Sequence, residues 1–134
     1  MLIKKFVVGP METNCYVFAD EVSKETAVID PGGGSSEVKN FLEKKNLKLK
    51  YVINTHGHAD HIGANAYFDA DVLIHEKDAD FLTDPGLNLS SAFGADIRGG
   101  TAKRLLKDGD DIRVGKEVLR VIHTPGHTPG AICL

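Results

Sequence analysis

The segment THGHADH, residues 55–61, places four side chains that commonly bind metals within seven positions: His56, His58, Asp60 and His61. In an extended chain the side chains alternate with a period of two, so His56 and His58 point the same way and can reach one ion. Asp60 and His61 follow where a helix would begin, so we expect them to turn away from this pair, toward a second ion. Imidazole and carboxylate together suit zinc, iron or manganese. A polar loop that is only rich in histidine is the weaker interpretation.

A second segment, HTPGHTPG at residues 123–130, offers His123 and His127 as further ligands. A helix would place both on one face, but the Thr-Pro-Gly between them prevents a helix. We therefore expect only one of them to join His56 and His58. Three protein ligands with an open fourth position are typical of a catalytic zinc site. Such an ion lowers the pKa of its bound water to about 7, and a second ion about 3.5–4 Å away would stabilise a developing oxyanion.

Strands and short helices alternate along the chain and must position these two segments. Apolar and β-branched runs predict strands at residues 2–8, 14–20, 25–30, 51–54, 72–75, 117–123 and 131–134. A helix is expected from a cap at Ser35 or Ser36 to about Asn46, and shorter helices at 61–68 and 76–82. The 51–54 strand leads directly into THGHADH. Residues 84–104 are predicted to form a loop, and a lid over the site is one interpretation of it.

The composition describes one soluble globular domain. The chain has 134 residues, of which 42% are hydrophobic and 26% charged. Its formal charge of -3 gives no support to a nucleic-acid partner. No segment approaches the roughly 18 apolar residues of a membrane span, so no membrane partner and a cytoplasmic location are expected. Cys15 and Cys133 both lie in apolar surroundings and are expected to be buried free thiols.

Taken together, five segments resemble the metallo-β-lactamase superfamily, and most closely its glyoxalase II-like (hydroxyacylglutathione hydrolase-like) branch. They are TNCY (13–16), IDPGG (29–33), THGHADHIGAN (55–65), DGDDIRVG (108–115) and HTPGHTPG (123–130). The resemblance implies an α/β fold, the N-terminal half of an αββα sandwich, with a mixed β-sheet and helices on its outer face. It makes residues 1–134 one domain. Family members continue with a second β-lobe, which is expected to be missing here.

The resemblance also implies the ligands. The first metal would be held by three histidines: His56, His58 and His127. Asp60 and His61 would help to hold a second ion, and Asp60 would also orient the nucleophile. Asp30 would support the site from behind the ligands. Zinc is the expected metal, as one or two ions, with iron or manganese as alternatives. A bridging aspartate and a last histidine would lie in the missing lobe, so the second ion is expected to bind weakly.

The function that the resemblance implies is hydrolysis of an acyl bond in a small-molecule substrate, in which a metal-bound hydroxide attacks the carbonyl. A thioester is the first expectation and a lactone the second. The zinc β-lactamases of the family lack a histidine at the place of His61, which argues against antibiotic hydrolysis. The flavodiiron branch has a glutamate where His58 stands and is excluded. The rival hypothesis is a non-catalytic metal-binding half-domain that forms a homodimer through its open sheet.

Overall fold

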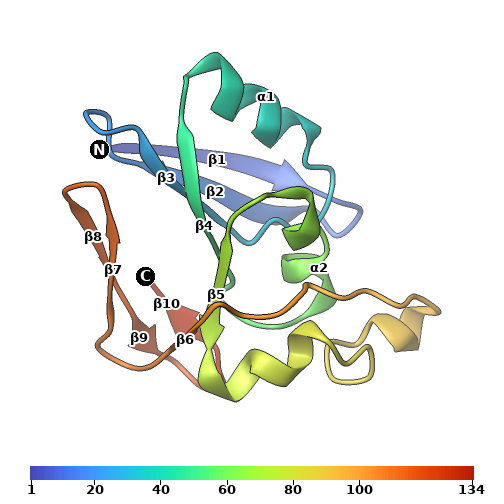
Figure 1. The fold of residues 1–134 in the computed structure, drawn as a ribbon. Helices are drawn as coiled ribbons and strands as arrows, with labels where there is room; N and C mark the ends of the chain where they lie inside the picture. Colours follow the sequence, from blue (N-terminus) through green and yellow to red (C-terminus); the bar gives the residue numbers. More distant parts are fainter.

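Six strands form one mixed sheet in the computed structural model, which describes all of residues 1–134 (Figure 1). In spatial order they are β1 Leu2–Val8, β2 Thr13–Ala19, β3 Glu25–Ile29, β4 Lys48–Ile53, β5 Asp71–His75 and β6 Arg104–Leu106. The first three pair in antiparallel fashion, whereas β3 to β6 are all parallel. This arrangement confirms the predicted α/β fold with a mixed sheet.

Helices cover one face of the sheet. The α-helices are α1 Ser36–Lys44 and α2 Ala59–Ile62, and the 3₁₀-helices are η1 Asn65–Tyr67, η2 Glu76–Leu82 and η3 Ser90–Phe93. Val38 and Leu42 of α1 pack on the side chains of β2, β3 and β4 that point to this face: Val17, Val28 and Val52. Ile62 of α2 and Leu82 of η2 pack on Ile74 of β5. The outer-face helices expected from the sequence are therefore present.

Two small hairpins cover the opposite face. They consist of β7 Asp111–Val114 with β8 Glu117–Arg120, and of β9 Ile122–His123 with β10 Ile132–Cys133. Ile112, Val114 and Ile132 from the hairpins join one core with the sheet residues that alternate to this side: Phe18, Ala27, Ile29, Ile53 and Leu73. Figure 1 shows α1 and the β7–β8 hairpin on opposite sides of the sheet. Strand alternation thus divides the apolar residues between two layers of packing.

Several boundaries differ from the sequence prediction. The predicted 117–123 strand is divided into β8 and β9, because Val121 leaves the ladder and donates its N–H to the carbonyl of Asp110. Ser35 occupies the cap position of α1, but its buried hydroxyl makes no hydrogen bond, so the expected side-chain cap is not formed. The predicted 84–104 loop contains η3.

The two cysteines differ in their surroundings. Both are free, as predicted. Cys15 is buried in β2, and burial raises the pKa of its thiol to about 12. Cys133 is exposed, so the expectation that it is buried was wrong. Its neighbour Ile132 takes the inward-facing position of β10 instead. No helix is both long and apolar enough to cross a membrane.

Candidate metal centre

The carboxyl ends of the parallel strands position the candidate site. Asp30 follows β3, Asn54 and the THGHADH segment follow β4, and η2 follows β5. Neighbouring parallel strands end at the same edge of a sheet, which is where open α/β sheets bind ligands. The chain leaves the buried Ile53 and reaches His56 three residues later, so the strand fixes where the histidines begin.

Three histidines converge at this edge. One ring nitrogen from each of His56, His58 and His127 lies within 4.8 Å of the other two. His58 Nδ1 is 3.0 Å from His127 Nε2. His56 Nε2 is buried and has no hydrogen-bond partner. A buried polar atom without a partner is rare in a folded protein, and a bound ion would satisfy it. The set of three imidazoles fits a divalent cation such as zinc or iron.

Burial lowers the pKa of two of these rings and so favours the neutral form that binds a cation. It lowers the pKa of His56 to about 4, and the neighbouring His61 adds to this effect. The pKa of His58 is also lowered, first by burial and then by His127. Both imidazoles are therefore neutral at pH 7. Metal ligation needs the neutral form, so these two rings do not have to lose a proton when an ion binds.

The second histidine segment contributes His127 to the cluster and not His123. The His123 ring stacks on the buried His75, with 4.2 Å between ring centroids and 11° between planes. Its Nε2 lies 2.9 Å from the Pro129 carbonyl oxygen. His75 itself accepts a hydrogen bond from the Lys77 N–H through Nδ1. The prediction that only one of the two histidines joins His56 and His58 agrees with this geometry.

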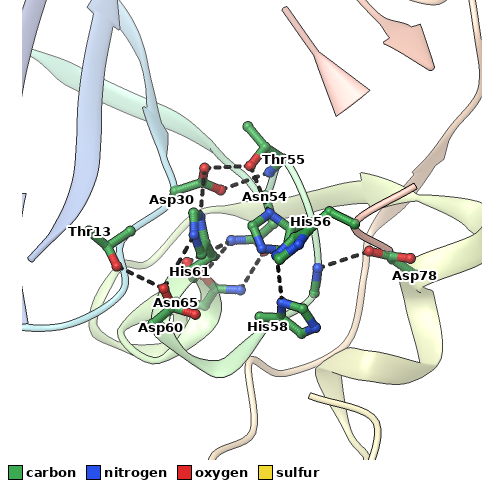
Figure 2. A network of polar contacts seen from close by, with 12 residues as sticks. Thr13, Asp30, Asn54, Thr55, His56, His58, Asp60, His61, Asn65 and Asp78 are labelled. Atoms are coloured by element: carbon green, nitrogen blue, oxygen red, sulfur yellow. Dashed lines mark hydrogen bonds and ion pairs between the residues drawn. The ribbon is translucent and has the colours of Figure 1, made fainter. Parts of the chain in front are cut away.

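His61 lies between two carboxylates (Figure 2). Its Nδ1 is 3.0 Å from Asp30 Oδ2, and its Nε2 is 3.4 Å from Asp60 Oδ2. Burial by itself lowers the pKa of His61, but Asp30 and then Asp60 outweigh burial, so the pKa is raised. Asp60 Oδ2 also accepts a hydrogen bond of 3.0 Å from the Thr13 hydroxyl.

His61 lies outside the cluster of three ring nitrogens, yet closer to His56 than expected. Its ring centroid is only 4.0 Å from that of His56. Asp30, whose Oδ2 is the atom 3.0 Å from His61 Nδ1, accepts hydrogen bonds from the N–H and the hydroxyl of Thr55, at 2.7 and 2.6 Å. One buried carboxylate therefore positions both the start of the histidine loop and the His61 ring. This is the supporting position that the resemblance implied for Asp30.

Asp78 joins the two histidine segments, and sequence reasoning missed it. Its fully buried carboxylate accepts hydrogen bonds from the N–H of Gly57, the hydroxyl of Thr128 and the N–H of Gly130, at 3.0, 2.6 and 2.6 Å. Gly57 lies between His56 and His58, and Thr128 follows His127. The carboxylate thus ties the ligand-bearing loops together. An aspartate in the polar stretch EKDAD gives no local signal of burial, so only the structure identifies it.

Two buried asparagines hold α2 in place, and they too were not predicted. Asn65 donates to the side-chain oxygen of Asn54 at 2.8 Å and to the Gly99 carbonyl at 3.1 Å. Asn54 donates in turn to the His61 carbonyl at 3.1 Å (Figure 2). Gly57, between His56 and His58, has no room for a side chain. A Cβ on Gly57 would lie 2.3 Å from the Cβ of Phe81, so its role is close packing.

Comparison with known proteins places this geometry in context. The sequence profile of the metallo-beta-lactamase superfamily matches residues 8–134. An uncharacterized protein of Aquifex aeolicus is 37% identical over 139 residues, which span 100% of this chain and 64% of that protein. Hydroxyacylglutathione hydrolase GloC of Haemophilus influenzae is 30% identical over 138 residues, or 98% of this chain and 65% of that protein.

Solved structures agree with the sequence relatives. The crystal structure of the BLEG-1 B3 metallo-beta-lactamase matches with a TM-score of 0.87 and 35% identity, over 98% of this chain and 65% of that one. The chain therefore spans just under two thirds of the length of these relatives.

Proposed function

The chain belongs to the metallo-β-lactamase superfamily, and we propose that it is a metal-dependent hydrolase that cleaves acyl bonds, thioesters first. The observation that carries the proposal is the cluster of three histidine rings with the unpartnered, buried Nε2 of His56. The similarity to hydroxyacylglutathione hydrolase GloC supports a thioester. A lactone is the alternative ester substrate.

In this proposal His56, His58 and His127 hold the first ion. Asp60 and His61 contribute to a second. A divalent cation at such a site lowers the pKa of water and stabilises the oxyanion of an attacked carbonyl. Zinc is proposed first, with iron or manganese as alternatives, because imidazole and carboxylate accept all three.

Asp60 is the residue best placed to orient a nucleophilic water. Its Oδ2 is occupied by the Thr13 hydroxyl and by the contact with His61. Oδ1 makes no hydrogen bond within the chain, and the side chain is 32% exposed. A fixed carboxylate with one free oxygen can accept a hydrogen bond from a water molecule and so hold that water in one orientation. Thr13 and His61 set the direction of that free oxygen.

The test is reconstitution of the protein after its metals have been stripped with a chelator. Zinc, iron(II) or manganese(II) is added back, and bound metal per chain is measured by elemental analysis. S-lactoylglutathione and a simple lactone are then offered as substrates. We expect at least one tightly bound metal per chain and thioester hydrolysis that depends on it. Hydrolysis that continues undiminished in the stripped protein, or full metal loading without any acyl hydrolysis, would overturn the proposal.

A second candidate is hydrolysis of a β-lactam. Its specific support is the BLEG-1 B3 metallo-beta-lactamase structure, with its 35% identity and TM-score of 0.87. This likeness weakens the argument from His61 against antibiotic hydrolysis. A β-lactam amide and a thioester both pass through a tetrahedral oxyanion, so one site can serve either. Offering a chromogenic cephalosporin to the same reconstituted protein separates the two candidates.

A further inference from the structure

A pocket of about 300 Å³ opens beside the histidine cluster. Its polar lining residues are His58, Asp60, Asn88 and His127. This volume is at the small end of the range for ligand sites, so it suits part of a molecule. A substrate whose reacting carbonyl lies against the histidines would extend one of its substituents into this space.

The apolar part of the lining includes three large side chains: Met11, Leu89 and Phe93. Met11 comes from the turn between β1 and β2, whereas Leu89 and Phe93 belong to the segment around η3. Their exposed fractions are 64%, 47% and 80%. Single exposed apolar residues are common on proteins. Three around one pocket form a patch of the kind that binds ligands.

The segment that carries Leu89 and Phe93, residues 88–93, is held in position by hydrogen bonds. The fully buried Asn88 donates to the carbonyls of Phe81 and Ile97, at 3.0 and 2.8 Å, and its own carbonyl accepts from the N–H of Ala59 at 3.0 Å. The bond from Ala59 connects this segment directly to the histidine loop, because Ala59 follows His58. Leu89 adopts a left-handed backbone, with φ of 69°. That conformation is unfavourable for a branched residue and persists only where the surrounding structure imposes it.

The charge of the lining restricts the ligand. No lysine or arginine lines this pocket, and Asp60 is its only acidic residue. A carboxylate at the far end of the acyl group, beyond the reach of an ion held by the histidines, would find no lysine or arginine among the lining residues. An apolar group, by contrast, would cover Met11, Leu89 and Phe93 and remove them from water.

We propose that Met11, Leu89 and Phe93 bind the acyl group of the substrate and select an uncharged apolar one, an aliphatic chain or a single aromatic ring. This inference rests on the proposed acyl hydrolysis and deepens it, because it names the class of acyl group. Recognition is through apolar contact, so affinity should rise by about fourfold for each methylene that the pocket buries.

The test begins with binding to the metal-free protein, which needs no catalysis. Butanamide, hexanamide and octanamide are titrated into the isotope-labelled chain, and amide and methyl resonances are followed by NMR. We expect the resonances of Met11, Leu89 and Phe93 to move, with affinity increasing along the series. Glutaramate, which resembles a short amide but ends in a carboxylate, should bind at least about tenfold more weakly than hexanamide.

Two variants localise the effect. Phe93→Ala should weaken octanamide binding by at least about fivefold, and because Phe93 is so exposed its removal leaves the core intact. Tyr67→Ala is the matched control: it removes an aromatic ring that is 65% exposed and lines a separate groove beside α1. It should leave binding unchanged. Equal affinity for all three amides, or resonance changes centred on Tyr67, would overturn the inference.

A second measurement separates this inference from the proposed function. The metal-loaded protein is given acetyl, hexanoyl and octanoyl thioesters of N-acetylcysteamine. A rising kcat/KM along the series that Phe93→Ala flattens supports both. Hydrolysis that is independent of chain length overturns the acyl pocket and leaves the proposed function standing. Amide binding at Phe93 without any hydrolysis supports the pocket and overturns the proposed function.

Discussion

The three-histidine cluster lies next to a second group, in which His61 lies between Asp30 and Asp60. Both groups contain histidines, but the pKa values of these histidines are shifted in opposite directions. Around His56 and His58 the dominant influence is burial, which lowers both pKa values. Around His61 the two carboxylates outweigh burial and raise its pKa. Only 4.0 Å separates the ring centroids of His56 and His61. Two adjacent imidazoles therefore differ in proton affinity, because burial dominates at His56 whereas two carboxylates dominate at His61.

The difference indicates an order of metal binding. His56 offers a neutral, unpartnered nitrogen, so a cation gains a ligand without displacing a proton or an existing contact. His61 must exchange its contacts with Asp30 or Asp60 before it can ligate an ion. The cluster should therefore fill first, and the His61 side should bind more weakly.

Removing a ring from the cluster should have the largest effect. We expect His58→Ala and His127→Ala each to weaken binding of the first metal by more than about 100-fold, since loss of a direct ligand exceeds the usual effect of supporting residues. Calorimetric titration of zinc into the stripped protein measures this. His123→Ala, which removes a histidine of the same segment outside the cluster, is the control. Equal losses in all three variants would contradict the assignment of the cluster.

Removing Asp78, which joins the two histidine segments, should also weaken binding of the first metal, but by less. Asp78→Ala leaves the N–H groups of Gly57 and Gly130 without their acceptor and should weaken the first metal by about 10–100-fold. Asp78→Asn should lie between the wild type and Asp78→Ala, because the amide keeps one acceptor oxygen. Asp80→Ala, an exposed neighbour on the same 3₁₀-helix, should change nothing. Metal titration and chemical denaturation together separate an effect on affinity from one on folding.

The contrast in charge can be measured directly by NMR titration of the histidine rings in the stripped protein. His56 should remain neutral until about pH 4, whereas His61 should be protonated at a higher pH than an ordinary histidine. Asp30→Asn should lower the pKa of His61. The exposed Asp96→Asn, which loses only a surface pair with Arg98, should leave it unchanged.

The pKa shifts of His56 and His61 make the stability of the folded protein depend on pH in opposite directions. The folded protein binds a proton at His56 less readily than the unfolded chain does. The stability due to a neutral His56 is therefore present above about pH 6.5 and is lost as the pH falls toward 4. The raised pKa of His61 contributes stability that is present below its ordinary value and lost as the pH rises through the folded value. Titration of both rings near the ordinary histidine value of about 6.5 would contradict both statements.

The smallest effect on the site should come from a change far from both groups. Gly115, in the β7–β8 turn, has φ of 61°, and a Cβ there would lie 2.2 Å from Asp20 Oδ2. Gly115→Ala should lower the free energy of unfolding by about 1–3 kcal/mol without changing metal affinity. Gly109→Ala is matched in backbone, with φ of 80° and open space around it, and should cost only about 1 kcal/mol. A loss of metal affinity in the folded Gly115 variant would show that general stability controls the site.

Local patterns in the sequence predicted most of the strands, but not β6, which begins in the predicted 84–104 loop. Alternation and β-branched residues placed β1 at residues 2–8 with the boundaries that the structure has. The same patterns failed where a tertiary contact decides the backbone, as at Val121, whose N–H bonds to Asp110 outside the ladder. Cys133 was misjudged because a short apolar run does not reveal which of its members faces the core. Asp78 could not be foreseen, since its three partners lie 21, 50 and 52 positions away in sequence.

Residue types and their spacing alone indicate the chemistry, because THGHADH and HTPGHTPG supply imidazole and carboxylate groups at spacings that suit metal ions. Side-chain type and local backbone preference are properties of neighbouring residues, so the sequence carries them directly. The fold brings His127 to within 3.0 Å of His58, 69 positions away, and sets the His61 ring beside that of His56. The reason is that the shared edge of the parallel strands, with Asp30 and Asp78 buried behind the loops, brings together groups that no local pattern relates.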